Sequence, residues 1–353
     1  MGEESFNTAA SSKHHMIGGD GPNSYARNSA YQKELLVSAE GLMQELIWKH
    51  LNFDPEKMKT FRIADFGCSV GPNAFLVVEN IIAAVEKRCK PEDEVPEFHV
   101  FFNDVISNDF NTLFKLVPAS RKYLVAAAPG SFHSRLFPKG TIHIAHCSTA
   151  LHWLSRVPEK VCNRGRIHYS GAGKEVIKAY SCQYERDMEA FLRARGDELV
   201  SGGLMVLLLI GFPDGYTLAS DSSIGQAFHI LGSCLYDMAK MGKISEEDVD
   251  GFNLPFYYPS PTELKALIEA NGAFSVERMV ELGAPMRRNP DATTVVAHLR
   301  AVIGVLLQEH FGKEIVEEVF HLHLDKLLKK PNIVDHTHHK ETIYFLFLKR
   351  NSY

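Results

Sequence analysis

Seven short apolar runs alternate with segments of helical periodicity, and this alternation constrains the fold of the chain more than any other feature. The runs are rich in Val, Ile, Leu and Phe, and they lie at residues 62–66, 98–103, 123–127, 142–147, 204–210, 274–279 and 343–348. Strands that alternate with helices are typical of a doubly wound, mostly parallel α/β sheet. The first linking helix is the clearest, because apolar residues recur at helical spacing from Phe75 to Val85, just after Pro72.

Two long segments, 211–261 and 283–340, exceed the length that such a sheet needs for its connections, and both show mostly helical patterns. Helices inserted beside the carboxyl ends of the strands commonly cover a ligand crevice. We therefore expect one Rossmann-like domain over residues 16–353, with these two segments as a helical cap and residues 1–15 as a flexible N-terminus.

Composition excludes several classes of partner. The 353-residue chain has 38 Lys and Arg against 43 Asp and Glu, a net charge of −5, so it has no basic excess for binding nucleic acid. The longest apolar run, 204–210, is far shorter than the about 20 residues of a membrane span, and the N-terminus is polar. The six cysteines are scattered without a C-x-x-C pair, which is typical of reduced thiols. We expect a cytoplasmic protein without membrane or nucleic-acid contacts.

A glycine-rich turn, ADFGCSVGPN at residues 64–73, follows the first expected strand and opens the first helix. Its order is G-x-x-x-G, not the G-x-G-x-x-G of dinucleotide sites, and Asp65 precedes the first glycine. A carboxylate here repels pyrophosphate but suits a cationic ligand. Asp104 ends the second expected strand, where a carboxylate can accept the hydroxyls of a ribose. The pair indicates an S-adenosylmethionine site, with Asp65 near the amino-acid end. From these residues alone, a nicotinamide dehydrogenase or two ordinary strand-end residues remain alternatives.

Several longer motifs occur in a fixed order through nearly the whole chain. They are residues 16–32 (MIGGDGPNSYARNSAYQ), 64–73, 102–104 (FND), 108–111 (NDFN), 129–132 (PGSF), 147–154 (CSTALHWL), 163–168 (NRGRIH) and 250–255 (DGFNLP). This set resembles the plant SABATH methyltransferases, which transfer a methyl group from S-adenosylmethionine to small carboxylic acids or to xanthine nitrogens. The sequence of these motifs is most similar to that of carboxyl methyltransferases of the loganic-acid and farnesoic-acid type.

The resemblance implies a seven-stranded methyltransferase sheet and a set of cofactor-binding residues. These residues are Tyr25, Asp65, Cys68, Asn73, Asp104, Val105, Ser131, Phe132, Cys147 and Ser148. The N-terminal signature and the glycine turn would hold the amino-acid end, and Asp104 the ribose. Val105, which stands where relatives usually have Leu, would lie under the adenine, with Ser131 and Phe132 on its other side. The backbone around Cys147 and Ser148 would close the site.

The resemblance also implies a methyl-acceptor pocket gripped by Gln32, His152 and Trp153, the expected catalytic residues. The amide, the imidazole N–H and the indole N–H are all donors, so they can orient a carboxylate toward the methyl group. A carboxylate is ionised at neutral pH and needs no general base, so catalysis would rest on in-line positioning and desolvation. The other residues expected to line the acceptor pocket are Thr149, Ile210, Ala227, Phe228 and Tyr257.

Two features bear on the acceptor. His152 resembles the carboxyl-methylating branch more than the xanthine-methylating branch. Ile17 replaces a Lys that many relatives carry, so a positive charge that could assist binding of the acid is missing. Ala227 and Phe228 leave more room in the acceptor pocket than a flat benzenoid ring needs.

We predict a methyl ester of a small plant specialised-metabolite acid as the product. The alternatives are an N-methyltransferase acting on a xanthine or other alkaloid, and a non-catalytic ligand-binding member. The glycine order and Asp65 argue against a nicotinamide oxidoreductase.

The resemblance further implies weak Mg²⁺ ligands at Asn163, Asp250, the Phe252 carbonyl and Asn253, and a homodimer. Oxygen ligands suit Mg²⁺, but only one of the four carries a charge, so a hydrogen-bonded contact between the two loops is the favoured alternative. Five histidines near the C-terminus, at 321, 323, 336, 338 and 339, lack neighbouring cysteines or clustered carboxylates. We expect them on a solvated helix face and loop, not at a metal.

Overall fold

The fold is built on a seven-stranded sheet in the order β3-β2-β1-β4-β5-β7-β6. The computed structural model describes residues 15–54, 57–90, 94–159, 163–216, 222–282, 291–329 and 342–352. The strands are β1 (Thr60–Phe66), β2 (Glu97–Asp104), β3 (Tyr123–Pro129), β4 (Ile142–Ser148), β5 (Leu199–Gly211), β6 (Phe274–Glu281) and β7 (Thr342–Arg350). β1 to β5 run parallel, and β7 is antiparallel to β5 and β6. All seven expected strands are present, and the mostly parallel sheet is confirmed.

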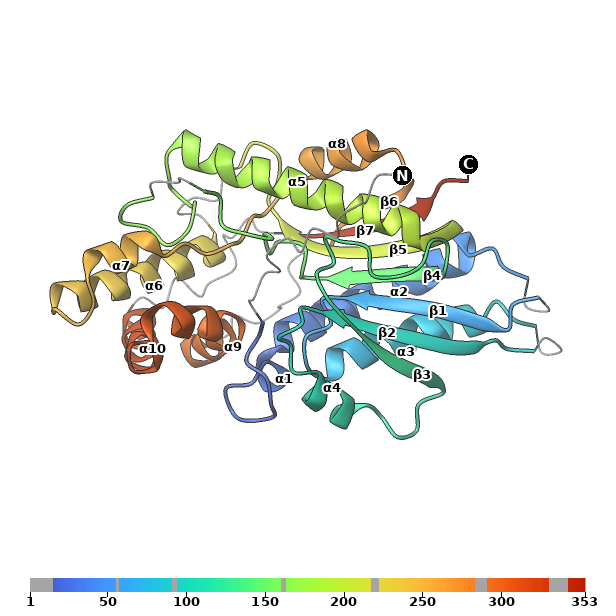
Figure 1. Cartoon of the computed structure of the whole chain (residues 1–353), viewed down its shortest axis with the longest axis horizontal. Helices are drawn as coiled ribbons and strands as arrows, with labels where there is room; N and C mark the ends of the chain where they lie inside the picture. Colours follow the sequence, from blue (N-terminus) through green and yellow to red (C-terminus); the bar gives the residue numbers. More distant parts are fainter. Residues whose placement is uncertain are drawn as a thin grey trace, which may run out of the picture.

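The helices pack on both faces of this sheet and beyond its carboxyl edge (Figure 1). They are α1 (Tyr25–Asn28), α2 (Ala30–His50), α3 (Pro72–Glu86), α4 (Phe110–Leu116), α5 (Lys174–Glu198), α6 (Ser223–Lys240), α7 (Glu246–Gly251), α8 (Pro261–Asn271), α9 (Ala292–Phe311) and α10 (Lys313–Leu328). α2 and α3 cover one face, and α5 and α8 cover the other. α3 begins at Pro72, as expected, because a helix's first turn needs no N–H from that residue.

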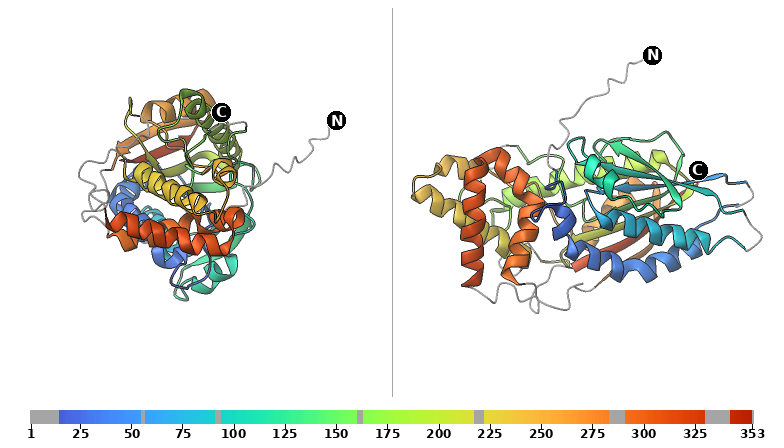
Figure 2. Two further views of the ribbon diagram at one scale, coloured as in Figure 1. Left: turned by 90° about the vertical axis from the view of Figure 1, so that its left-hand side faces the viewer. Right: turned by 90° about the horizontal axis from the view of Figure 1, so that it is seen from below.

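Four of the helices, α6, α7, α9 and α10, gather beyond the carboxyl ends of the parallel strands (Figures 1 and 2). We call them the cap helices. α9 packs along α10, and α10 also packs on α6. The segment that carries α9 and α10 leaves the sheet after β6 and returns at β7, where the backbone N–H of Leu282 donates to the Ile343 carbonyl at 2.8 Å. The expected flexible segment is residues 1–15, of which residues 1–14 lie outside the described residues. The division into domains stays a prediction.

Helix α9 has the length and apolar composition of a membrane span, which no uninterrupted apolar run in the sequence indicated. The burial of its side chains accounts for this apolar composition without a membrane. Eight of its residues are buried, and Arg300 forms an ion pair with Glu317 of α10. A core helix of a folded protein meets the same criteria of length and composition.

One expectation for the C-terminal histidines is wrong. His323 is fully buried, because it shares the inner face of α10 with Val319 and Leu327 at a spacing of four residues. His321 is exposed, as expected, and the histidines at 336, 338 and 339 lie outside the described residues. Helix packing, not polarity, decides where His323 lies.

Candidate active site

Two carboxylates lie at the carboxyl ends of the neighbouring strands β1 and β2. Asp104 accepts the backbone N–H of Ser69 through Oδ2 and that of Val105 through Oδ1, both at 2.7 Å. Burial raises the pKa of Asp104 to about 6, against the opposing effect of these two N–H groups, and the like charge of Asp65 adds to the rise. Two partly or fully buried carboxylates that repel each other favour a cationic ligand between them.

The conformation of the turn between β1 and α3 explains why glycine occupies two of its positions. Gly67 has φ 74°, and a Cβ there would lie 2.4 Å from Cβ of Ala150, in the loop after β4. Gly71 has φ 128°, and its Cβ would lie 3.0 Å from Cα of Ala26 in α1. Only glycine tolerates both the backbone conformation and the close approach. The turn therefore packs closely between the loop after β4 and helix α1 of the N-terminal motif.

The residues expected at the amino-acid end of the cofactor come together around this turn. Burial raises the pKa values of Tyr25 and Cys68, and the charges of Asp104 and Asp65 raise both further. Burial likewise raises the pKa of Cys147, with Asp65 again adding to the shift. All three side chains are therefore neutral at pH 7, in the field of the two carboxylates. Asn73 donates to the carbonyl and hydroxyl oxygens of Ser29, at 3.1 and 3.0 Å, which joins α3 to the start of α2.

The residues expected around the adenine lie on the strand ends next to Asp104. Val105 is buried directly after it, and the backbone N–H of Gly130 donates to the Asp104 carbonyl at 2.9 Å. Ser131 and Phe132 follow, and a ring atom of Phe132 lies 3.8 Å from the place where a Cβ on Gly67 would be. The structure therefore brings the ribose and adenine candidates to one edge of the sheet.

A buried ion pair behind this edge was missed by sequence reasoning. Arg195 and Glu198 on α5 are both fully buried and meet at 2.7 Å, and the guanidinium also donates to the carbonyls of Phe132 and Ser134. Glu198 accepts the backbone N–H groups of Leu136 and Phe137. The spacing of three residues predicts a helical pair, but nothing in the sequence indicated that it is buried. The pair fixes the loop that carries Ser131 and Phe132.

A second missed pair lies under the glycine turn. His146 of β4 and Asp65 of β1 are opposite each other in the parallel ladder, and Nδ1 and Oδ1 are 2.7 Å apart. Both residues are almost fully buried. The carboxylate that the sequence places at the amino-acid end is therefore held by a histidine that the sequence did not single out.

The acceptor candidates His152 and Trp153 lie in the loop after β4. Thr149 opens this loop in the left-handed region, at φ 50°, although its side chain is β-branched, and its N–H donates to the Leu208 carbonyl at 2.8 Å. Such a conformation is strained for threonine and is held by the surrounding structure. It turns the chain sharply at the carboxyl edge of the sheet, next to Ser148 and opposite Gly67.

His152 is enclosed by aromatic rings. Its imidazole stacks on Tyr258, with ring centres 5.5 Å apart, and contacts Phe256 at 5.6 Å and Trp153 at 6.4 Å. Burial lowers the pKa of His152 to about 3, so the ring is neutral at physiological pH. Trp153 meets Phe256 edge to face at 4.3 Å. A neutral imidazole beside an indole offers polar N–H groups in an apolar setting.

Several buried polar atoms at this edge have no hydrogen-bond partner among the described residues. They are Oγ of Ser69 and Ser148, Oε1 of Gln32 and Nδ1 of His152. Gln32 lies in the first turn of α2, close to the Ser29 contact of Asn73. Buried polar groups are rarely left unpaired except where a ligand or water satisfies them. These atoms therefore fit a polar ligand at the carboxyl edge of the sheet.

The remaining acceptor-lining candidates differ in orientation. Phe228 of α6 stacks on Phe256, with ring centres 5.6 Å apart, and Ala227 precedes it on the same helix. Ile210 is buried near the end of β5. The Tyr257 hydroxyl donates to Glu263 of α8 at 3.0 Å. Because α8 packs on the sheet, the Tyr257 hydroxyl is held by its hydrogen bond to that helix. Only the ring or the backbone of Tyr257 is then left to contact a methyl acceptor.

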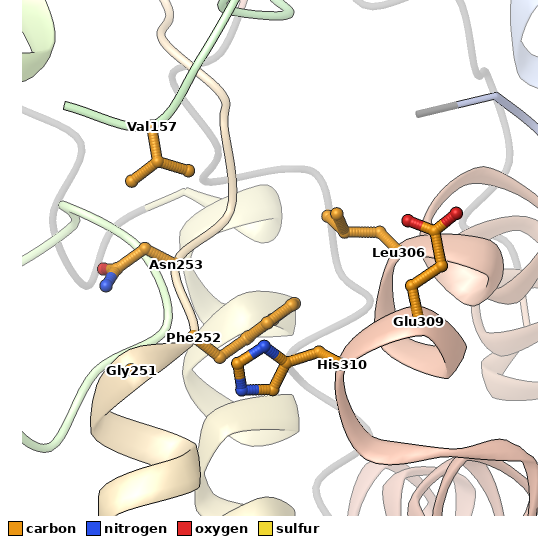
Figure 3. A pocket seen from close by; sticks show the side chains of 7 residues that line it. All are labelled: Val157, Gly251, Phe252, Asn253, Leu306, Glu309 and His310. Carbon is orange, nitrogen blue, oxygen red and sulfur yellow. The ribbon is translucent and has the colours of Figure 1, made fainter. Parts of the chain in front are cut away.

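A cavity of about 280 Å³ lies between the cap helices and the loop after Trp153 (Figure 3). Its lining residues are Val157, Gly251, Phe252, Asn253, Leu306, Glu309 and His310. Trp153 and Phe256 are joined by a backbone bridge, and Val157 and Asn253 continue the same two segments. The cavity therefore follows directly from the segments that carry the acceptor candidates.

The expected metal ligands make a hydrogen-bonded loop contact. The Asn163 amide donates to Oδ1 of Asn253 at 2.8 Å and to the His168 carbonyl at 2.9 Å. Oδ1 of Asp250 accepts the hydroxyl of Tyr236 and the N–H of Gly165. The described residues contain no cluster of three His, Cys, Asp or Glu side chains for a metal ion. Oδ1 of Asn253 and Oδ1 of Asp250 already accept hydrogen bonds, whereas the buried Oδ1 of Asn163 has no partner among the described residues. The hydrogen-bonded loop contact that we expected as the alternative is present.

Comparison with known proteins decides the family. A family profile described as "SAM dependent carboxyl methyltransferase" matches residues 11–351. The chain belongs to this family. It is an S-adenosylmethionine-dependent carboxyl O-methyltransferase, so the nicotinamide oxidoreductase considered from the glycine turn is wrong.

Its relatives fit this assignment closely. The carboxyl methyltransferase is 44% identical to loganic acid O-methyltransferase of Catharanthus roseus, over 96% of this chain and 94% of that protein. It is 39% identical to farnesoic acid carboxyl-O-methyltransferase of Arabidopsis thaliana, over 88% and 91% of the two chains. A solved structure, titled "Loganic acid methyltransferase with SAH", superposes with a TM-score of 0.92 at 43% identity, covering 96% of this chain and 99% of the other. The resemblance inferred from the motifs is confirmed.

Proposed function

We propose that this enzyme transfers the methyl group of S-adenosylmethionine to the carboxylate of a small plant acid, giving the methyl ester and S-adenosylhomocysteine. The observation that carries the proposal is the neutral, buried His152 beside Trp153, in a loop at the same sheet edge as Asp65 and Asp104. When bound, S-adenosylmethionine supplies the electrophilic methyl group. The roles below are those that the protein's own residues would take.

Asp65 and Asp104 would hold the cationic and ribose portions of the cofactor. Each oxygen of Asp104 already accepts one backbone N–H, and a carboxylate has about four acceptor positions, so two remain for the ribose hydroxyls. Asp65 lies on the neighbouring strand, where a carboxylate attracts the ammonium and sulfonium charges. Phe132 and Val105 provide the apolar faces on either side of the adenine.

Gln32, His152 and Trp153 would orient the acceptor carboxylate by donating hydrogen bonds. With a pKa of about 3, the His152 imidazole is a poor base but a competent N–H donor. No base is needed, because a carboxylate is already ionised at neutral pH. Excluding water around these donors and aligning an acceptor oxygen with the methyl group are then the main sources of rate enhancement.

We place the acceptor in the class of the loganic and farnesoic acids. Two similar enzymes carry those acids in their names. Ile17 supports it too, because an aliphatic side chain that packs against Gly304 of α9 adds no charge to the pocket.

A panel of plant acids with methyl-labelled S-adenosylmethionine tests the proposal. We expect one or more larger acids to give a product heavier by one methylene, which mild alkali hydrolyses back to the acid. Benzoic acid serves as the small comparison substrate. A product that survives alkali, formed from a xanthine and from no acid, would replace the carboxylate with a nitrogen acceptor. Binding of S-adenosylhomocysteine without turnover of any acid would favour a non-catalytic member.

We also propose a homodimer in the cytoplasm, as the family resemblance and the scattered cysteines suggest. Within the described part of the chain, Cys68, Cys147, Cys182 and Cys234 form no disulfide, which is compatible with a reducing compartment. Light scattering at micromolar concentration measures the mass in solution, and a fluorescent fusion in plant cells reports the compartment. A monomeric mass, or fluorescence confined to an organelle, contradicts the corresponding proposal.

A further inference from the structure

The Asp65–His146 pair lies on one face of the sheet, beside the glycine turn that is expected to hold the amino-acid end of the cofactor. The two residues are register partners on the parallel strands β1 and β4, so their side chains project from the same face. Nδ1 of His146 and Oδ1 of Asp65 are 2.7 Å apart, and the residues are 1% and 4% exposed. Because an ionised carboxylate can only accept, the imidazole donates to it through Nδ1.

A buried carboxylate needs a partner, because removing its charge from water without a hydrogen bond is costly. His146 provides that partner and at the same time fixes the orientation of the carboxylate. One oxygen of Asp65 is taken up by Nδ1, which leaves Oδ2 to accept from a ligand. Without the histidine, the carboxylate can rotate or turn away from the ligand.

The charge of Asp65 acts on several titratable side chains around the glycine turn. It contributes to the raised pKa values of Tyr25, Cys68 and Cys147, and to that of Asp104. Its position therefore decides how the negative potential is shared between the amino-acid and ribose portions of the site.

We propose that His146 is a positioning residue, which holds Asp65 in place to bind the ammonium group at the amino-acid end of the cofactor. This inference rests on the proposed cofactor role of Asp65. His146 itself does not touch the cofactor. It acts through one hydrogen bond, and the acceptor chemistry at His152 does not depend on it.

Two nucleoside ligands separate this role from general support of the fold. S-adenosylhomocysteine carries the amino-acid end, whereas 5′-methylthioadenosine has the same adenosine and sulfur without it. His146→Phe keeps a ring of similar size and removes the donor to Asp65. By calorimetry, we expect its affinity for S-adenosylhomocysteine to fall about 10-fold, as for the loss of a hydrogen bond to a charged group, with less than a twofold change for 5′-methylthioadenosine.

Asp104→Asn is the matched control, because Asp104 is assigned to the ribose that both ligands share. We expect that variant to bind both ligands more weakly by similar factors. His146→Asn is the rescue variant, because its amide N–H can replace Nδ1–H, and its affinity for S-adenosylhomocysteine should stay within about threefold of the original protein.

A double variant tests whether His146 acts through Asp65. If it does, His146→Phe added to Asp65→Asn should lower the S-adenosylhomocysteine affinity no further than Asp65→Asn alone. Equal losses for both ligands, or additive losses in the double variant, overturn the positioning role. If His146→Phe does not fold, His146→Asn and Asp65→Asn with both ligands decide the question. If the unmodified protein fails to bind S-adenosylhomocysteine, the proposed function itself fails, which is a separate result.

Discussion

Arg195 and Glu198 form an ion pair at 2.7 Å in the interior of the protein, and this pair holds the loop that is expected to flank the adenine. The guanidinium also lies 4.1 Å from the ring centre of Phe66, at the end of β1. One residue of α5 therefore contacts both the strand that leads into the glycine turn and the loop that carries Phe132. The geometry of the expected cofactor site therefore depends on a helix that carries none of the expected cofactor-binding residues.

Replacing Arg195 should lower the free energy of unfolding substantially. Arg195→Met leaves Glu198 as an unpaired buried charge, and breaking a buried pair in this way destabilises proteins by about 3–5 kcal/mol. Urea unfolding measures the change. The exposed pair between Lys265 and Glu269 provides the control, since Lys265→Ala should change stability by no more than about 0.5 kcal/mol. Similar effects of the two substitutions would show that the buried pair contributes little.

Cofactor binding should weaken in acid through Asp104. The pKa of this carboxyl is raised to about 6, and the ionised form is the one that accepts ribose hydroxyls. Affinity for S-adenosylhomocysteine should therefore be full at pH 7.5 and decline as the pH falls through about 6. Asp104→Asn should bind about 10-fold more weakly at pH 7.5, for loss of hydrogen bonds to a charged group. Calorimetry of this variant from pH 5 to 7.5 should show no decline in affinity as the pH falls through about 6. If the variant shows the same decline as the original protein, a group other than Asp104 causes it.

The donor role of His152 can be separated from a base role. His152→Ala removes the donor and should lower kcat/KM by about 10- to 150-fold, the cost of one hydrogen bond to a charged group. His152→Gln retains a donor and should keep much more activity on the best acid of the panel. Because the His152 pKa is about 3, its titration should not shape the rate profile between pH 5 and 8. Equal losses in the two variants would indicate that the imidazole acts as a base.

Buried neutral histidines should make the protein less stable in mild acid. Burial lowers the pKa of His168 to about 3, so between pH 6.5 and 3 the unfolded chain binds a proton that the folded protein does not. The free energy of unfolding therefore falls as the pH falls below 6.5. His168→Gln should remove about 1 kcal/mol of the loss between pH 7 and 5.5. The exposed His321, changed to Gln, is the control, and equal curves for both variants would contradict the assignment.

Chelation should leave the activity nearly unchanged. The oxygens of Asp250 and Asn253 accept hydrogen bonds from Tyr236, Gly165 and Asn163, so the loops are joined without an ion. Turnover after EDTA treatment and gel filtration measures the effect. Complete loss of activity that Mg²⁺ alone restores would show that the loops do bind the metal.

Much of the fold could be predicted because its signals are local. Each strand is a short apolar run, and a doubly wound sheet places the ends of β1 and β2 at one edge, so Asp65 and Asp104 could be placed together. His152 was expected near them only because of the family resemblance. The His146–Asp65 contact could not be predicted in the same way, because its members are 81 residues apart and depend on the pairing of β1 with β4.

Other differences have the same physical origin. His323 was expected in solvent because histidine is polar, but the packing of α10 on α6 and α9 buries it. The hydrogen bond from the Tyr257 hydroxyl to Glu263 in the capped first turn of α8 could not be predicted either, and the place of Tyr257 in the acceptor pocket stays a prediction. Burial and rotamer are set by neighbours distant in sequence, which single motifs do not encode.

The contact between Leu282 and Ile343 has a consequence for how such enzymes change. The chain that carries α9 and α10 departs from the sheet and rejoins it at one hydrogen-bonded position, 2.8 Å across. Because its two ends adjoin, this segment can be longer or shorter without a shift in the register of β6 against β7. The length of this segment can therefore change while the strands that are expected to hold the methyl donor keep their alignment.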